Sequence, residues 1–207
     1  MASKRPVSNL LGLAVLCYLS EQPLHPYALG RMLRQHGDAR SIKFNHGSLY
    51  MVVQQLARAG FVAEHETGRE GARPEHTVYA LTDAGRLELT DWLHELLGQP
   101  RHEYPAFVAA LSLMAALPPA EVAGLLRNRL TALAGQRAEI TGLIETSAAN
   151  GVPGLFLIEE EYRLAQLDTE VAFTERLIAS ITDPGTDWAL FWAGQHGVPF
   201  PAVAPAE

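Results

Sequence analysis

The sequence contains very little that would build a metal site or a disulfide framework. Cys17 is the single cysteine among 207 residues, so no internal disulfide can form and no cysteine-based zinc site is available. The 8 histidines include no pair at i, i+4 and no HExxH motif. We therefore predict that the protein binds no metal ion and needs no cofactor.

Motifs of enzymes and membrane proteins are missing as well. The chain has no P-loop, no strand followed by GxGxxG and no GxSxG nucleophile motif, which argues against an enzyme. Its most apolar run, LLGLAVLCYL, is about half the length of a membrane-spanning helix. No small-residue cleavage site follows this run after the basic start MASKRPVSN. We expect a cytoplasmic protein that is not an enzyme, with Cys17 buried inside the run as a small apolar residue.

Positive charge is scarce overall and is concentrated in the N-terminal part. The net charge is −7, but residues 1–90 contain 10 Lys and Arg against 8 Asp and Glu, whereas residues 91–207 contain 6 against 15. Binding to nucleic acid needs a local basic face and not a basic chain. DNA would repel the acidic C-terminal part and so help to orient the molecule. The candidates for a basic face are Lys4, Arg5, Arg31, Arg34, Arg40, Lys43, Arg58, Arg69 and Arg73.

An apolar stripe predicts a helix around position 50. Leu49, Val53 and Leu56 recur at i, i+4 and i+7, so one side of this helix faces a core. Gly60 is suited to end the helix, because a residue without a Cβ adopts a left-handed conformation at little cost. Polar side chains lie off the stripe and are expected to face a partner.

A two-stranded hairpin is expected directly after this helix. Segments 61–66 and 75–81 are β-type runs around the Gly-rich loop TGREGARP. A helix fits the major groove of DNA, and arginines at a hairpin tip reach phosphates or the minor groove. Helix N-termini also commonly face phosphates or base edges. On these grounds we predict DNA contacts from Tyr27, Lys43, Asn45, His46, Ser48, Gln54, Arg58, Arg69 and Arg73, with an exposed polar role as the alternative for His46.

These motifs resemble the PadR family of winged helix-turn-helix transcriptional regulators. The strings GSLYMVVQQLARAGFV and RPEHTVYALTDAGR carry the resemblance, together with HPYALGRML upstream. It covers roughly residues 7–97 in motif and 104–181 in architecture, where the chain is similar to members with a larger helical C-terminal domain. The resemblance implies a DNA-binding regulator. It also implies that Tyr50 contacts DNA, the alternative being that this ring stacks in the core.

The predicted fold is mainly α and has three regions. Residues 1–98 form a winged helix-turn-helix DNA-binding domain with a two-stranded wing and a linker helix. Residues 104–182 form an α-helical dimerisation domain, in which two long antiparallel helices meet at the turn NGVPG. Residues 183–207 form a tail that is partly docked or disordered.

Homodimerisation is predicted from apolar surface that one copy is too small to bury. The first helix, residues 7–19, is apolar nearly all round, so a three-helix winged domain is not expected to cover it alone. The second long helix is expected to turn Ile158 and Tyr162 inward and to expose the glutamate run at 159–161. We expect the first helix and the C-terminal helices to pack against a second copy.

Trp92 has two interpretations. It shares a helical stripe with Leu89, Leu93 and Leu96, and such a stripe is typical of residues with which a helix faces the protein core. Some PadR relatives bind flat aromatic compounds with a tryptophan on the matching helix. The resemblance therefore also implies an effector pocket lined by these four residues, between the winged domain and the dimer interface.

The sequence predicts a sequence-specific transcriptional regulator. We expect a homodimeric repressor that binds an inverted-repeat operator in double-stranded DNA and is released by a small aromatic effector. One alternative is a winged-helix dimerisation or nucleoid-type module without an effector. The other is the dimerisation part of an enzyme such as a methyltransferase, although no nucleotide-binding βαβ segment follows the winged domain.

Overall fold

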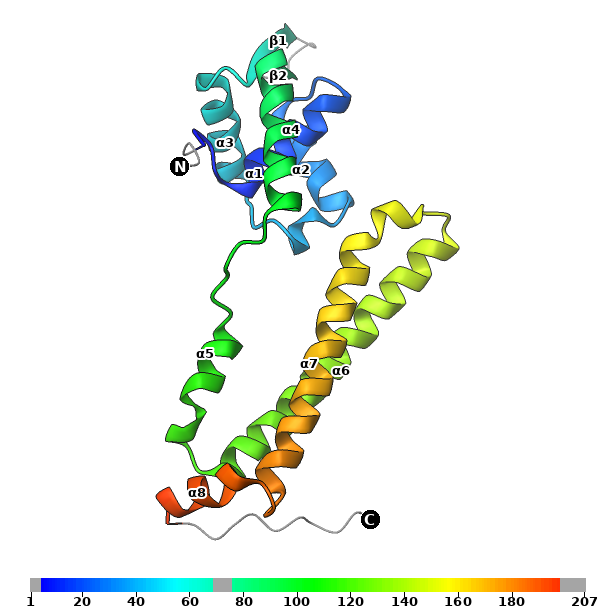
Figure 1. The fold of residues 1–207 in the computed structure, drawn as a ribbon. Coiled ribbons are helices and arrows are strands. Elements are labelled where there is room, and N and C mark those ends of the chain that lie inside the picture. Colours follow the sequence, from blue (N-terminus) through cyan, green and yellow to red (C-terminus); the bar gives the residue numbers. More distant parts are fainter. Residues whose placement is uncertain (1–4, 69–75, 198–207) are drawn as a thin grey trace. The chain divides into compact units, whose positions relative to one another are not determined.

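The structure is a computed structural model, and it describes residues 5–68 and 76–197. The chain forms two compact units, Met1–His102 and Glu103–Glu207. The N-terminal unit contains α1 (Leu10–Glu21), α2 (Pro26–Gln35), the 3-10 turn η1 (Asp38–Arg40), α3 (His46–Arg58), β1 (Val62–Gly68), β2 (His76–Leu81) and α4 (Asp83–Gly98). The predicted fold class is confirmed, because this unit combines a helix-turn-helix pair with a two-stranded antiparallel wing (Figure 1).

Local sequence signals start and stop the helices that carry the wing. Pro26 occupies the first turn of α2, where its missing N–H has no helical partner to lose. Gly60 has φ 78°, so it turns the chain from α3 into β1 as predicted. Thr82 caps α4, because its hydroxyl accepts from the amide of Gly85 at 3.0 Å and donates to the carbonyl of Gly60 at 2.7 Å.

The wing is tied to the helices by a third short strand segment. β1 and β2 pair antiparallel, with Val62 opposite Leu81 and a bulge between Glu64 and Glu66. Leu24 forms an isolated antiparallel bridge with Tyr79, with backbone N–O distances of 3.0 and 2.9 Å. This bridge fixes the start of α2 against β2. The predicted wing-tip arginines, Arg69 and Arg73, lie outside the described residues.

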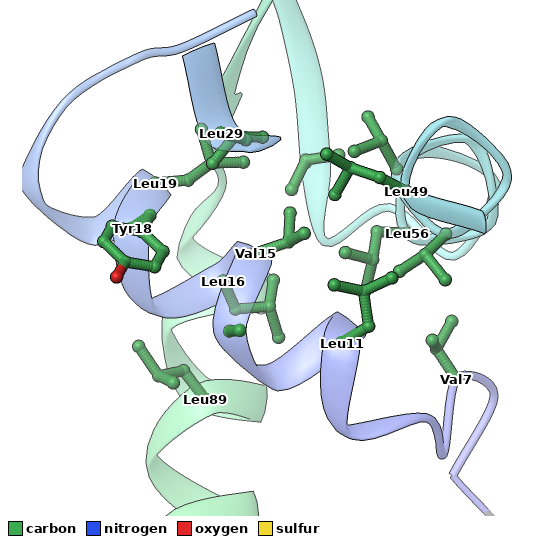
Figure 2. Close-up of a cluster of buried hydrophobic side chains, with 14 of the residues drawn as sticks. Val7, Leu11, Val15, Leu16, Tyr18, Leu19, Leu29, Leu49, Leu56 and Leu89 are labelled. Carbon is green, nitrogen blue, oxygen red and sulfur yellow. The ribbon is translucent and has the colours of Figure 1, made fainter. Parts of the chain in front are cut away.

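α1 lies at the centre of the N-terminal core. Figure 2 shows Leu11, Val15 and Leu16 of α1 among side chains from α2, α3 and α4. The expectation that a winged domain cannot cover this helix is wrong for most of its surface, because α3, α4 and β2 all pack on it. Cys17 is exposed, so the prediction that it is buried is also wrong. It lies seven residues after the exposed Leu10, on the face that α3, α4 and β2 leave open.

The C-terminal unit is a long helical hairpin with two short helices at one end. It contains α5 (Ala106–Leu113), η2 (Met114–Ala116), α6 (Pro119–Ala149), η3 (Gly154–Phe156), α7 (Ile158–Thr182) and α8 (Asp187–Gln195). α6 and α7 run side by side (Figure 1). Arg129 pairs with Glu170 at 2.5 Å, and Arg137 pairs with Asp168 at 2.5 Å. These two pairs add to the apolar contacts that set the register of the hairpin.

α8 docks through aromatic and polar contacts within the C-terminal unit. The indole N–H of Trp192 donates to the carbonyl of Leu117 at 2.9 Å, and its ring is buried with Val122 and Ile181. Nε2 of His196 lies 2.9 Å from the carbonyl oxygen of Ala115. The start of the predicted tail is therefore a helix that packs on the α5–α6 turn.

The inner face of α7 differs from the predicted one. Ile158 and Tyr162 are 55% and 65% exposed, so the expectation that they point inward is wrong. The buried positions are Glu160, Thr174 and Ile181, which lie at multiples of seven residues from one another. Glu160 is thus not part of a solvated glutamate face. Its carboxylate lies 3.7 Å from the guanidinium of Arg163.

Residues 5–68 and 76–197 contain no helix that is both long and apolar enough to span a lipid bilayer. Within the same ranges, no group of three or more His, Cys, Asp or Glu side chains is placed to hold a metal ion.

Candidate nucleic-acid interface

α3 has one buried face and one exposed face. Its buried residues include the predicted stripe and one more: Leu49, Val52, Val53 and Leu56. The opposite face carries Gly47, Met51, Gln54 and Arg58, all exposed and spaced at i, i+4, i+7 and i+11. This exposed face contains two of the predicted DNA contacts, Gln54 and Arg58.

A capping box holds the N-terminal end of α3. The side-chain oxygen of Asn45 accepts from the amide of Ser48 at 2.8 Å, and the hydroxyl of Ser48 accepts from the amide of Asn45 at 2.8 Å. The Ser48 hydroxyl also donates to the carbonyl of Asn45 at 2.9 Å. Both side chains are therefore engaged in starting the helix. The structure gives these two residues a positioning role, and their direct contact with DNA stays a prediction.

An aromatic stack joins the first turns of α2 and α3. The ring of Tyr27 lies between two imidazoles, 6.0 Å from the centroid of His25 and 5.9 Å from that of His46, with interplanar angles of 12° and 16°. Gly30 allows this approach, because an added Cβ would lie 3.1 Å from Cδ2 of Leu49. Tyr27 is 55% exposed, so its hydroxyl edge is open beside the N-terminal end of α3.

Several cations stand exposed around α2 and α3. Tyr50 is 46% exposed, which removes the core interpretation of its ring. Lys43 precedes α3, and Arg58 lines a groove with Ser8, Asn9 and Gln55. Within the part of the chain that the structure describes, no ion pair involves Arg31, Arg34, Lys43 or Arg58. Among the described residues, no carboxylate neutralises these four charges in an ion pair.

Arg5 does not belong to this basic face. Its guanidinium lies 2.6 Å from Glu88, 2.8 Å from Asp91 and 2.7 Å from Glu95, three carboxylates on one side of α4. Burial alone would lower the pKa of Arg5, but the hydrogen bonds to these carboxylates outweigh it and raise the pKa above its usual value. The carboxylates neutralise the cation, and the cluster ties the N-terminal segment to α4.

A second polar cluster joins α1 to the end of α2. The hydroxyl of Tyr18 donates to Asp38 and lies 2.9 Å from Nδ1 of His36. Burial raises the pKa of Tyr18, and the neighbouring Asp38 carboxylate raises it further, so the phenol stays neutral. The contact fixes the turn between α2 and α3, where Gly37 has φ 80°.

The four residues predicted to line an effector pocket differ in burial. Trp92 is 2% exposed, and together with Leu89 it belongs to the buried N-terminal core, with Leu96 packed against that core. The guanidinium of Arg5 lies 5.3 Å from the Trp92 ring centroid, a cation–π contact. Leu93 is exposed on another side of α4. These contacts support the core interpretation of Trp92, and the effector role of the four residues stays a prediction.

Sequence reasoning missed two features of the exposed α3 face. Met51 is 55% exposed at its centre, although the apolar pattern gives no reason to leave this side chain outside. Gly47 lies one turn before it, and an added Cβ would meet only the Asn45 side chain, at an ordinary 3.4 Å. The spacing of i, i+4 between Gly47 and Met51 was the signal that could have placed both on the exposed face.

The arrangement of the N-terminal unit defines a winged helix-turn-helix DNA-binding domain. α3, the second helix of the helix-turn-helix pair, presents a largely polar exposed face, and the wing follows it directly. No residue that the structure describes forms an ion pair with Arg31, Arg34, Lys43 or Arg58. Residues 15–91 match the model of the transcriptional regulator PadR-like family. The matched residues run from α1 into α4, so the winged-helix unit is similar to regulators of transcription of the PadR type.

Similar proteins agree in fold and extent. The negative transcriptional regulator PadR of Bacillus subtilis (strain 168) is 26% identical over 149 residues, which cover 72% of this chain and 80% of that protein. The crystal structure of Bacillus subtilis PadR with operator DNA matches with a TM-score of 0.66 and 22% identity, covering 84% of this chain and 99% of that one. The same PadR with p-coumaric acid matches with a TM-score of 0.66 and 19% identity, covering 84% and 100%. The matched family and relative are regulators of transcription and not enzymes.

Proposed function

We propose that this protein is a cytoplasmic transcriptional repressor that binds an inverted-repeat operator as a homodimer. α3 enters the major groove, and its exposed face reads base edges. The single observation that carries this proposal is that face, on which Gln54 and Arg58 stand free of the core beside uncompensated cations. The similarity in fold to a PadR solved with operator DNA supports DNA binding by this chain.

Phosphate contacts and base contacts have separate sources in this proposal. Lys43, Tyr27 and Tyr50 surround the N-terminal half of α3 and are exposed, so they are suited to hold phosphates. Gln54 carries an amide that can pair with N6 and N7 of adenine. Arg69 and Arg73, which the sequence predicts at the wing tip, would add further contacts with phosphates or the minor groove.

Gln54→Ala tests sequence reading. The loss of a two-bond contact to adenine is expected to weaken binding to the preferred operator by about 1–3 kcal/mol and to leave binding to random DNA nearly unchanged. Lys43→Ala is the control, because a lost phosphate contact weakens both complexes alike. Titrations of the full chain with operator and random duplexes at fixed salt measure both. Equal losses for Gln54→Ala on the two duplexes would contradict base reading.

Homodimerisation is proposed from apolar surface that the C-terminal unit leaves exposed. Its buried cluster around Trp192 is small, whereas α5, α6, η3 and α7 expose large apolar side chains. Soluble monomers rarely expose apolar surface on this scale, which is typical of contact with another protein surface. The exposed residues of these four elements are Val108, Leu113, Leu125, Leu155, Phe156, Ile158, Tyr162 and Phe173.

The double variant Ile158→Asp/Tyr162→Asp tests this interface. Both side chains are exposed one turn apart on α7, so two charges should not unfold one copy but should oppose burial against a second copy. We expect a dimer for the unaltered full chain at micromolar concentration and a monomer for the variant, measured by sedimentation velocity. Leu87→Asp on α4, 73% exposed, is the control and is expected to stay dimeric. A monomeric unaltered chain would contradict the proposal.

We also propose a small aromatic effector that releases the operator. A PadR structure contains p-coumaric acid, a planar molecule with polar ends, and this supports the same ligand class here. A ligand need prefer the released form by only about 1.4 kcal/mol to weaken operator binding tenfold. Leu93 and Leu96 on α4 are the residues we place closest to it, because Leu93 is exposed and Leu96 packs only against the outside of the core.

A further inference from the structure

We propose that Met51 determines operator specificity by packing against the C5 methyl group of a thymine in the major groove. The inference rests on the proposed function, because it needs the exposed face of α3 to enter that groove. Met51 is 55% exposed between Gly47 and Gln54, and Tyr50 beside it is the other large side chain that the described α3 exposes.

The exposure of Met51 is unusual for its position. The core of the N-terminal unit is already filled along the other side of α3 by leucines and valines, and the described residues leave Met51 55% exposed. A long apolar side chain in water is unfavourable unless a partner covers it, and the thymine methyl is the apolar group that the major groove offers. The flexible, polarisable Met side chain can adapt to such a contact.

The neighbours of Met51 make a combined reading site. Gln54 follows by three positions and lies next to it on the same face, so the two side chains address adjacent positions in the groove. A Gln amide suits adenine, and a Met thioether suits the thymine methyl. The pair therefore selects a step rich in A·T pairs in each half-site.

Gly47 allows the helix to come close enough for this contact. It stands one turn before Met51, and the fold does not require glycine there: its backbone is right-handed helical, and an added Cβ would meet only Oδ1 of Asn45 at 3.4 Å. Glycine inside a helix costs stability relative to alanine. We assign this glycine to the approach of DNA, because its missing side chain removes bulk from the surface that faces the groove.

Replacing thymine by deoxyuridine tests the contact one methyl group at a time. The operator is first recovered by selection of the full chain against random duplexes, and each thymine is then replaced singly. We expect one thymine in each half-site whose replacement weakens binding about fourfold, the effect of uncovering one methyl group. Met51→Ala is expected to bind the thymine and deoxyuridine operators equally, and Met51→Leu is expected to keep a preference for thymine.

Two control variants separate this contact from general damage. Leu97→Ala removes an apolar side chain of α4 that is even more exposed than Met51, and it is expected to keep the full preference for thymine. Gly47→Ala is expected to weaken both operators alike without lowering the unfolding midpoint. If no single thymine matters, or if Met51→Ala keeps the preference, the inference is overturned. If selection recovers no preferred duplex at all, the proposed function itself fails, which is a different result.

Discussion

Gly85→Ala is expected to destabilise the N-terminal unit by about 3 kcal/mol or more, because the added methyl group has no room. A Cβ at this position would lie 2.0 Å from the carbonyl oxygen of Phe61 and 2.7 Å from Cδ1 of Leu81. The Phe61 oxygen cannot move away easily, since it accepts hydrogen bonds from both the amide and the hydroxyl of Thr82, at 3.1 and 3.0 Å. The first turn of α4 would have to leave the wing.

The measurement is denaturant unfolding of the full chain, with hydrogen exchange of the α1 and α4 amides to report on the N-terminal unit separately. Gly98→Ala is the matched control, because it lies at the other end of the same helix and an added Cβ there meets nothing within 4 Å. We expect Gly98→Ala to change the free energy of unfolding by less than about 0.5 kcal/mol. If Gly85→Ala lowers the free energy of unfolding by less than about 1 kcal/mol, the prediction is contradicted, because α4 can then move away from the wing at little cost.

The winged domain could be predicted from sequence because its signals are local. The stripe through Leu49, Val53 and Leu56, the stop at Gly60 and the cap at Thr82 each act within a few residues, and the structure contains all of them. The role of Arg5 could not be predicted in this way. Its carboxylate partners lie more than 80 residues away along the chain, so a charge count assigned it to a DNA-binding face.

The C-terminal hairpin shows why apolar periodicity alone is insufficient. α7 buries Glu160 and Thr174 and exposes Ile158 and Tyr162, the reverse of what their polarity indicates. The residues of α7 that are buried are those that pack against α6. The ion pair between Arg129 of α6 and Glu170 of α7 is part of the same contact. A helix that also meets a second partner needs two apolar stripes, and the sequence does not say which of them faces its own chain.

Trp92→Ala is expected to lower the free energy of unfolding by about 3–5 kcal/mol, the cost of removing a large buried aromatic side chain. Trp92 is 2% exposed, and its ring lies against α1: a Cβ added at Gly12 would be 3.7 Å from it. The truncation also removes the ring from beneath the guanidinium of Arg5. Trp92→Phe keeps an aromatic face and is expected to cost clearly less. Denaturant unfolding of the three proteins gives these differences.

The same variants decide between the two roles of α4. A core residue and an effector-contacting residue both affect regulation when they are removed, but only the first lowers stability by several kcal/mol. Leu93 is 38% exposed, so Leu93→Ala is expected to cost less than about 1 kcal/mol and to weaken the response of operator binding to a planar aromatic acid. A Trp92→Ala protein that is as stable as the unaltered chain, yet no longer responds, would place Trp92 in the effector site. A full response in Leu93→Ala would remove the exposed side of α4 from that site, because a ligand in contact with Leu93 cannot bind equally well without it.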